Sequence, residues 1–383
     1  MDLELTPDQS AYRQAVREVL GSDEARAEAT RVRTTRGAEG GLLDVYRSLG
    51  RRGLLAPNWP EQYGGAGRTI VEKTILTEEL IAHGVPDIVH TLGIDIVGLA
   101  LQLFGTETQK QRLLPPLARG ESAAGVLFSE PEAGSDLSAL RTRAERDGDG
   151  WRLYGRKIYS AKTHLADFAL CAARTTEAEV RLHGLTVFVV PLKTVGVTVE
   201  PLWNIGNERF NEVTFSGLRV TEEDVLGRVD DGWQVIGQVL GLERTGVEFQ
   251  AKARRWLDAL LDRSGDTGAA AAEGDRLVAL DAEVRAARLL AWRCVNNLQN
   301  DTVDEVHSAM AKYLAGETAR TVALVAAELL GPDALLAGDD EEQAPDPGVL
   351  EAAYREAPGL TLASGTSEVM LTLIASTGLG LLA

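Results

Sequence analysis

The 383-residue sequence has only two cysteines, Cys171 and Cys294, which lie far apart and form no CxxC motif. Disulfide frameworks and thiolate metal sites need more cysteines or closer spacing, so neither is expected, and a reducing cytoplasm fits this content. The sequence also lacks any run of about 18 uncharged apolar residues. Its first ten residues, MDLELTPDQS, contain no basic segment followed by an apolar one. We therefore expect neither membrane insertion nor export.

Positive charge is scarce relative to negative charge. The chain has 39 Lys and Arg residues against 57 Asp and Glu residues, which gives a net charge of −18. Such a protein repels nucleic acid phosphates and anionic membranes at long range. The hydrophobic fraction of 44% is ordinary for a folded globular protein. The composition therefore predicts a folded protein without nucleic acid or membrane partners.

Several common catalytic motifs are missing. No GxGxxG follows a β-rich run, and GxxxxGK[ST], GxSxG and HExxH do not occur. A Rossmann site, a P-loop, a hydrolase nucleophile elbow and a zincin site are therefore not expected. The five histidines have no metal-ligand spacing, so no metal site is predicted. Any chemistry would depend on a bound organic cofactor or on a single carboxylate.

Helical patterns dominate the first region, residues 1–120. Thr6, Pro7 and Gln9 form a helix-start signal, in which Thr is the cap and Gln completes a capping box. Residues 121–228 instead contain short β-rich runs separated by Gly, Asp and Pro, which predict a small sheet or barrel. We assign this region as a central β-barrel domain.

Residues 229–383 return to helical periodicity. An example is the apolar spacing of Leu277, Leu280, Val284, Ala287, Ala291 and Val295. The acidic stretch 338–348 is expected to be a solvated linker because like charges repel. The predicted order is thus an α-helical domain, a β-domain and a second α-helical domain.

Glu243 interrupts an apolar helical face. If residues 233–250 form one helix, most apolar side chains share one arc and Glu243 lies within it, whereas Arg244 and Glu248 do not. A carboxyl group that loses hydration has a raised pKa, which suits a general base near neutral pH. The alternative is a structural ion pair with Arg254, about three turns further along the helix. Periodicity alone leaves both interpretations open.

Six stretches together resemble the acyl-CoA dehydrogenase family. They occur in the family's order and cover nearly the whole chain. The stretches are FGTETQKQRLLPPLARGE (104–121), LFSEPEAGSDLSAL (127–140), GRKIYSAKTHLADFALCAART (155–175), ERFNEVTFSGLRV (208–220), LGLERTG (240–246) and APGLTLASGTSEV (357–369). The resemblance implies an N-terminal helical domain, a central β-domain and a C-terminal four-helix bundle. It also implies homodimers or homotetramers with FAD between subunits.

The activity implied by the resemblance is the α,β-dehydrogenation of an acyl thioester. A base removes a proton from the α-carbon, and a hydride passes from the β-carbon to N5 of the flavin. Hydrogen-bond donors on the thioester carbonyl must stabilise the enolate charge. The acyl group would be carried by CoA or by a carrier protein, and the acidic surface favours CoA. An electron-transfer flavoprotein or a similar acceptor would reoxidise the flavin.

The resemblance also assigns cofactor contacts in the β-domain. Tyr159 occupies the position of an aromatic residue, usually Trp, that covers the flavin. Ala161 replaces the usual Thr or Ser that faces N5, and Ser160 is not expected to point the same way on a strand. Ser135 is also a candidate for contact with the phosphopantetheine arm of the substrate. The complete set of cofactor candidates in this domain is Val126, Phe128, Ser129, Gly134, Ser135, Tyr159, Ser160 and Ala161.

A second group of candidates lies near the end of the chain. Thr366 and Glu368 match cofactor-binding residues, and Gly365 is a candidate substrate contact. The residue before this Gly is the catalytic Glu in many family members, but here it is Ser364. Other members carry the base at the position of Glu243, so the resemblance favours Glu243 as the base. Arg244 would hold the turn or that carboxylate in place.

Some expected features on the partner side of the FAD site are absent. An Arg-x-x-Phe-Gly stretch does not follow residues 256–266, and a Gln-x-x-Gly-Gly stretch is replaced by residues 328–332, which begin with Glu328. An acidic group near a pyrophosphate is unfavourable. Met370 and Leu371 replace the usual Arg after Glu368. The chain is therefore either a homo-oligomer with altered contacts or one subunit of a heteromer.

Two alternatives to the leading function remain. The chain could be a non-catalytic or half-site partner subunit of a heteromeric acyl-CoA dehydrogenase. It could also be a flavin oxidase or monooxygenase built on the same fold. The colour of the purified protein, and the release of peroxide or insertion of oxygen, distinguish these alternatives.

Overall fold

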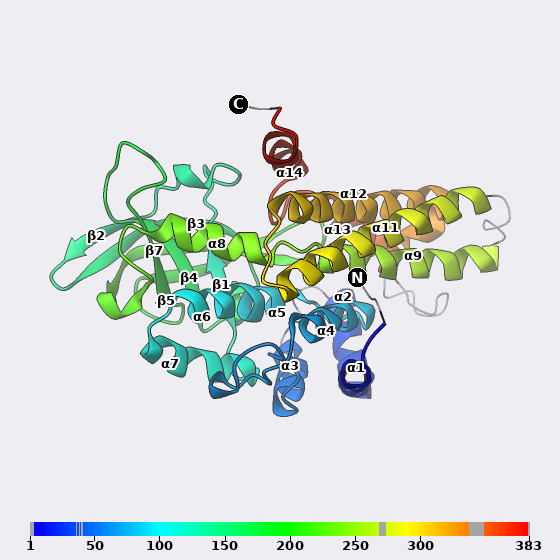
Figure 1. The fold of residues 1–383 in the computed structure, drawn as a ribbon, viewed down its shortest axis with the longest axis horizontal. Coiled ribbons are helices and arrows are strands. Elements are labelled where there is room, and N and C mark those ends of the chain that lie inside the picture. The colour runs from blue at the N-terminus through cyan, green and yellow to red at the C-terminus, as the bar shows by residue number, and fades with distance from the viewer. Residues whose placement is uncertain are drawn as a thin grey trace. The chain divides into compact units, whose positions relative to one another are not determined.

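A computed structural model describes residues 4–35, 37, 39, 41–267, 273–336 and 348–381 (Figure 1), but not the side chains of Glu243 and of residues 264–267. The predicted linker at 338–348 lies almost wholly outside the described residues. The chain divides into two compact units. The helical unit comprises residues 1–45, 68–87 and 244–383, and the sheet unit comprises residues 46–67 and 88–243.

The helical unit consists of helices from both ends of the chain. They are α1 (Pro7–Leu20), α2 (Asp23–Thr34), α4 (Ile70–Ala82), α9 (Val247–Thr267), α11 (Gly274–Gln299), α12 (Glu305–Leu330), η6 (Gly331–Leu335), α13 (Val349–Leu360), α14 (Ser367–Leu373) and η7 (Ile374–Gly378). α3 (Leu42–Arg51) begins in this unit and ends in the sheet unit. The predicted helix start is confirmed, because Thr6 caps α1 and forms a capping box with Gln9.

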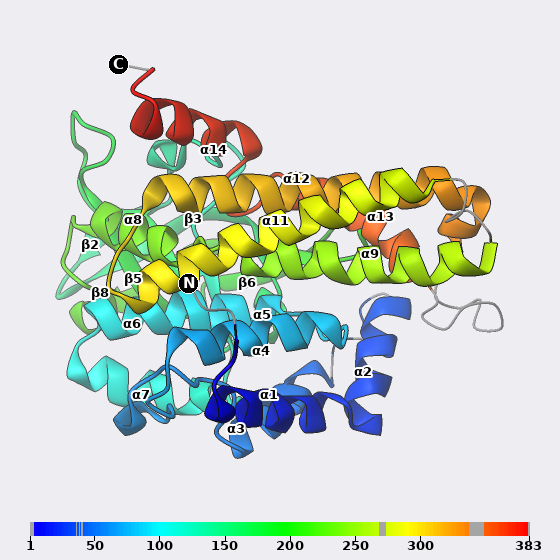
Figure 2. The same ribbon diagram turned by 45° about the vertical axis from the view of Figure 1, so that its right-hand side comes forward.

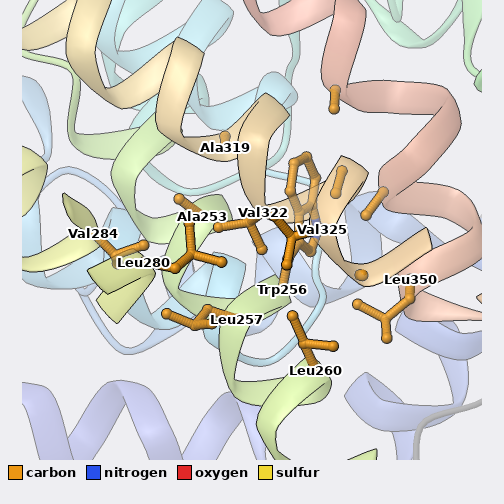
Figure 3. Close-up of a cluster of buried hydrophobic side chains, with 14 of the residues drawn as sticks. Ala253, Trp256, Leu257, Leu260, Leu280, Val284, Ala319, Val322, Val325 and Leu350 are labelled. Atoms are coloured by element: carbon orange, nitrogen blue, oxygen red, sulfur yellow. The ribbon is translucent and has the colours of Figure 1, made fainter. Parts of the chain in front are cut away.

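Four helices of this unit share one hydrophobic core. α12 packs against α9, α11 and α13, and Figure 2 shows α9 and α11 extending alongside it. Trp256, Leu257 and Leu260 of α9 meet Leu280 and Val284 of α11 in this core, together with Val322 of α12 and Leu350 of α13 (Figure 3). All six residues of the apolar spacing predicted for α11 are buried. The helical C-terminal domain is thus confirmed.

The sheet unit has helices and an eight-stranded sheet. The helices are η1 (Glu61–Tyr63), α5 (Ile88–His90), η2 (Thr91–Gly98), α6 (Leu99–Phe104), α7 (Glu107–Ala118), η3 (Leu137–Ala139), η4 (Thr163–Leu165), η5 (Glu222–Asp224) and α8 (Gly232–Glu243). The strands are β1 (Ala124–Leu127), β2 (Arg143–Asp147), β3 (Gly150–Ala161), β4 (Phe168–Arg174), β5 (Leu185–Pro191), β6 (Val197–Trp203), β7 (Arg209–Thr221) and β8 (Val225–Leu226). α8 packs on β5 and α6.

The sheet is not the barrel that the sequence predicted. Its strand order is β6-β7-β3-β2-β4-β5-β8, with β1 paired in parallel to β4. A barrel requires the first and last strands to pair, but within residues 124–226, all of which the structure describes, β6 and β8 do not pair. β8 has only two residues, and both pair with β5. The central domain is therefore an open mixed sheet.

The predicted continuous helix over residues 233–250 is also wrong. α8 ends at Glu243 and α9 begins at Val247. Gly246 between them has a φ of 76°, which a helix does not allow. A Cβ at this position would lie 2.9 Å from the carbonyl oxygen of Ala311, so the break packs tightly against α12. Among the described residues, no helix is both long enough and apolar enough to cross a membrane.

Candidate active site

The polar turn near the end of the chain connects α13 to α14. Ser364 and Gly365 have φ values of 54° and 98°, so both adopt conformations that favour glycine. A Cβ on Gly365 would lie 2.6 Å from Cε of Met370, so that flexible side chain would have to move, and the positive φ of Gly365 would strain any side chain there. Thr366 caps α14, since its Oγ1 accepts a hydrogen bond from the backbone N–H of Val369 at 3.3 Å. The turn therefore has a fixed shape.

Arg244 connects this turn to the break between α8 and α9. Its Nε donates a hydrogen bond to the carbonyl oxygen of Ser364 at 3.3 Å. Arg244 directly follows Glu243 in the sequence, and Ser364 is the position at which the resemblance implied a catalytic Glu in many family members. The two possible base positions are 243 and 364. Within the helical unit, Arg244, the neighbour of position 243, contacts position 364. The resemblance implied that Arg244 holds either this turn or the carboxylate of the base, and its catalytic role stays a prediction.

The side chain of Glu243 lies outside the described residues, so its burial remains a prediction. Its backbone ends α8, at the start of the break. The alternative interpretation paired Glu243 with Arg254. In the helical unit, Arg254 contacts Asp258 and lies 2.5 Å from Asp281, and these bonds raise its pKa despite partial burial. Arg254 therefore already has two carboxylate partners.

Glu368 is exposed in the first turn of α14. A backbone N–H bond lowers the pKa of its carboxyl group, and the side chain of Thr366 adds to this effect. The carboxylate is therefore ionised at neutral pH and accessible to a ligand. Met370 is buried and Leu371 is exposed, so at these two positions no charged group replaces the Arg that is usual in the family.

In the sheet unit, hydrogen bonds from β3 hold residues 128 and 129, which belong to the stretch 126–135 that contains the first five cofactor candidates. The carbonyl oxygen of Phe128 accepts a hydrogen bond from Nζ of Lys157 at 3.0 Å. The carbonyl oxygen of Ser129 accepts one from the backbone N–H of Ile158 at 3.0 Å. Val126 lies within β1 and pairs with Leu170. The structure thus brings the first of the predicted cofactor residues close to the Tyr159 region.

A buried ion pair stabilises this arrangement. Lys157 is 0% exposed, and its Nζ lies 2.8 Å from Oε1 of Glu130. Glu130 also accepts backbone hydrogen bonds from Arg141 at 2.6 Å and Thr142 at 2.9 Å. Burial alone would raise the pKa of Glu130, but Lys157 and these hydrogen bonds outweigh it and lower the pKa. The sequence analysis did not find this pair.

Tyr159 has an unusual backbone conformation. Its φ is 57° and its side chain is 64% exposed, at an irregularity in the pairing of β3 with β7. A bulky residue in the left-handed region is strained, and such strain is concentrated at functional sites. Ser160 and Ala161, in contrast, are buried, and the carbonyl oxygen of Ser160 accepts a hydrogen bond from Nδ2 of Asn211 at 2.9 Å. Tyr159 is therefore largely exposed, whereas the two residues after it are buried.

Gly134 and Ser135 lie on an exposed turn. A Cβ on Gly134 would meet no atom within 4 Å, and its φ is not positive, so the protein itself does not require glycine here. Gly134→Ala should therefore change the free energy of unfolding by no more than about 0.5 kcal/mol. If a ligand approaches this backbone closely, the added methyl group costs about 1–3 kcal/mol of binding. FAD and acyl-CoA titrations should show a Kd about fivefold higher or more for one of them, and unchanged values for both would contradict close approach.

Glu328, the acidic residue expected to disfavour a pyrophosphate, has a cationic partner. Its carboxylate contacts Arg276 of α11, and this bond raises the pKa of Arg276. Part of its charge is therefore compensated within the chain.

Sequence models of three domains match this chain. They are the acyl-CoA dehydrogenase N-terminal domain over residues 6–121, the middle domain over 125–218 and the C-terminal domain over 230–379. The chain belongs to the acyl-CoA dehydrogenase family. Members of this family are oxidoreductases that depend on FAD. The resemblance stated from the sequence motifs is thus confirmed.

Three relatives illustrate the similarity. Acyl-CoA dehydrogenase FadE34 of Mycobacterium tuberculosis is 33% identical over 87% of this chain. The matched region corresponds to 45% of the length of FadE34. A solved structure described as "Tcur3481-Tcur3483 steroid ACAD" is 29% identical, covers 99% of both chains and has a TM-score of 0.87. A chain in the crystal structure of the ChsE4-ChsE5 complex from Mycobacterium tuberculosis is 25% identical to this chain, with a TM-score of 0.84. The match covers 100% of this chain and 100% of that one.

The described residues of this acyl-CoA dehydrogenase fit a bound flavin. Tyr159 offers an exposed aromatic face at a strained position, and the turn at Gly134 leaves its backbone open to a ligand. The helical unit brings together Arg244, the turn 364–366 and Glu368, and the sheet unit brings together residues 126–130 and 157–161. Each set thus collects part of the predicted site.

Proposed function

We propose that this protein catalyses the FAD-dependent α,β-dehydrogenation of an acyl-CoA, with Glu243 as the base. The hydrogen bond from Arg244 to the carbonyl oxygen of Ser364 carries this proposal. It links the residue after Glu243 to the turn where a serine replaces the base of many relatives. A carboxylate supplied at position 243 would compensate for the carboxylate missing at position 364.

The proposed base must remove a weakly acidic proton next to a thioester. A carboxyl group at the end of an otherwise apolar helix has a raised pKa if it is buried, which improves proton transfer near neutral pH. Arg244 would keep the break and the turn in contact while the substrate binds. FAD, when bound, supplies the acceptor for the hydride from the β-carbon.

The cofactor would be held by two sets of residues. Tyr159 would cover the flavin, and backbone groups of residues 126–129 would lie along it. Thr366 and Glu368 would bind another part of FAD, while Ser135 and Gly365 would face the thioester. Ala161 provides no hydroxyl group for flavin N5, so we expect a flavin with altered affinity or reduction potential.

The substrate class and the electron acceptor extend this proposal. The FadE34 and steroid relatives favour a CoA thioester over a carrier-bound acyl group, as does the net charge of −18, which would repel an acidic carrier protein. A bulky polycyclic or branched acyl group is the first class to test. An electron-transfer flavoprotein or a similar acceptor would complete the cycle.

A second candidate function is a half-site subunit of a heteromer. The missing partner-side stretches and the acidic Glu328 favour it, as does the likeness to the ChsE4-ChsE5 complex. A homodimer or homotetramer with FAD between subunits is the leading alternative. The purified chain should be yellow if it binds FAD alone, whereas a colourless chain that turns yellow with a partner would favour the heteromer.

Anaerobic titration of the yellow protein with a panel of acyl-CoA thioesters tests the proposed function. The panel should include straight, branched and polycyclic acyl groups. We expect at least one to bleach the flavin and yield the enoyl-CoA. An absence of bleaching with every thioester, or stoichiometric peroxide in air, would favour the partner subunit or the flavin oxidase instead.

A further inference from the structure

Lys312 is a buried cation in the first third of α12. Its side chain is 0% exposed, and its Nζ donates a hydrogen bond to the carbonyl oxygen of Leu360 at 3.2 Å. Nζ also lies 5.4 Å from the centre of the Phe249 ring. Leu360 is the last residue of α13, directly before the turn 361–366. Lys312 therefore holds the start of the turn from inside the helical unit.

Glu317, on the same helix, holds the other end of the turn. Its Oε1 accepts a hydrogen bond from Oγ of Ser367 at 2.7 Å, and Nη2 of Arg320 lies 2.7 Å from Oε2. Ser367 is the first residue of α14. With Arg244 bound to Ser364, the turn is thus held at its beginning, middle and end.

Charged groups surround Lys312 from several elements. Burial lowers the pKa of Lys312 to about 8, and the charge of Arg244 acts in the same direction. Glu248 of α9, Glu317 of α12 and Glu368 of α14 oppose this shift without cancelling it. Holding a proton on Lys312 at neutral pH therefore costs folding free energy. Apolar replacement of buried ionic groups is often neutral or stabilising, so stability alone does not explain this lysine.

We propose that Lys312 is a positioning residue that, together with Glu317, holds the turn 361–366 in the shape that presents Thr366 and Glu368 to the cofactor. This inference rests on the proposed function, in which that turn contacts FAD. Lys312 itself is too deeply buried to touch a ligand. Its effect passes through the carbonyl oxygen of Leu360 and through the attraction between its charge and that of Glu368.

The proposal predicts opposite changes in stability and cofactor binding. Above pH 8 the folded protein releases the Lys312 proton while the unfolded chain keeps it up to about pH 10.4, so this group's contribution to stability rises with pH in that window. Over the same pH range Lys312 loses its charge, which weakens its hydrogen bond to the carbonyl oxygen of Leu360 and its attraction to Glu368. The turn is then held less firmly, so the affinity for FAD falls. A lysine without a positioning role would show the same rise in stability but no fall in the affinity for FAD.

Lys312→Met is the first test. We expect a Kd for FAD at least tenfold higher, with an apoprotein melting temperature that is unchanged or higher. Amide hydrogen exchange in residues 361–367 of the apoprotein should become faster. The affinity for FAD of the wild type should fall between pH 7 and 9, and that of the variant should not. Lys252→Met is the matched control, because Lys252 is partly buried and pairs with Asp87 and Glu356, neither of which belongs to the turn 361–366, and its Kd should equal that of the wild type.

A second variant covers a failure of Lys312→Met to fold. Ser367→Ala removes the donor to Glu317 and should also speed exchange in the turn and weaken FAD binding. If Lys312→Met binds FAD like the wild type with unchanged exchange in the turn, or loses stability and affinity together, the positioning role is wrong while the proposed function stands. If wild-type protein binds no FAD, alone or with a partner, both proposals fail.

Discussion

Glu243→Gln should slow reduction of the bound flavin by an acyl-CoA about 10²- to 10⁴-fold. Gln has nearly the shape of Glu but cannot accept the α-proton. The flavin content and the Kd for the thioester should stay close to those of the wild type, because no step of cofactor binding is assigned to this carboxylate. Anaerobic stopped-flow measurement of flavin bleaching with the best substrate measures the effect.

A second substitution distinguishes loss of the base from a local disturbance. Ser364→Glu in the Glu243→Gln background restores a carboxylate on the turn that Arg244 contacts. We expect partial recovery of the reduction rate, because proton abstraction needs a carboxylate within reach rather than a particular residue number. Glu305→Gln, an exposed change at the start of α12, is the control and should have no effect. A Glu243→Gln enzyme with the wild-type rate would exclude this residue as the base.

Lys157→Met should destabilise the protein by about 3–5 kcal/mol, because it leaves Glu130 buried without its cation. The carbonyl oxygen of Phe128 also loses its side-chain donor. Because Phe128 belongs to the segment 126–129 proposed to lie along the flavin, and Glu130 directly follows that segment, FAD should dissociate more readily as well. Chemical denaturation of the apoprotein and a flavin-release assay measure the two effects.

Lys193→Met is the matched control for this substitution. Lys193 pairs with Asp167 at 2.8 Å, but both side chains are largely exposed. Exposed pairs contribute about 0–1 kcal/mol, so this variant should unfold nearly like the wild type. Adding Glu130→Gln to Lys157→Met should recover part of the lost stability, since it removes the uncompensated charge. Equal destabilisation by Lys157→Met and Lys193→Met would show that the buried pair has no special importance.

Much of the secondary structure was predictable because apolar periodicity is strong in this sequence. The β-rich runs AAGVLF, WRLYGRKIY, FALCAA, GLTVFVVP and NEVTFSGLRV form β1, β3, β4, β5 and β7, and the apolar stripe of α11 is buried as predicted. β2 was missed because its sequence, RAERD, is charged, and only Ala144 of this strand is buried. The predictions of a barrel and of one helix over residues 233–250 were wrong. Whether the edge strands pair, and whether the chain breaks at Gly246, depend on tertiary packing that the sequence pattern does not show.

The site was predictable mainly where family motifs mark it. The motifs singled out Arg244 and Ser364, which the structure joins by a hydrogen bond, but they did not single out Lys157 or Lys312. For Lys312 the sequence holds a weak sign of burial. It precedes Ala315 and Ala319 by three and seven residues, so it lies on an otherwise apolar helical face. A lysine at such a position usually extends to solvent, so the pattern does not reveal that its amine is buried. Only the hydrogen bonds to Phe128 and Leu360 show where each amine lies.

Deuterium exchange at the α-carbon tests the central claim most directly, because it reports proton abstraction separately from hydride transfer. The FAD-loaded protein is incubated without oxygen in D2O with an acyl-CoA substrate, and the recovered thioester is analysed by mass spectrometry. The wild type should incorporate deuterium at the α-carbon, and Glu243→Gln should not, although it binds FAD and the thioester equally well. Exchange at the wild-type rate in Glu243→Gln would contradict the assignment of Glu243 as the base.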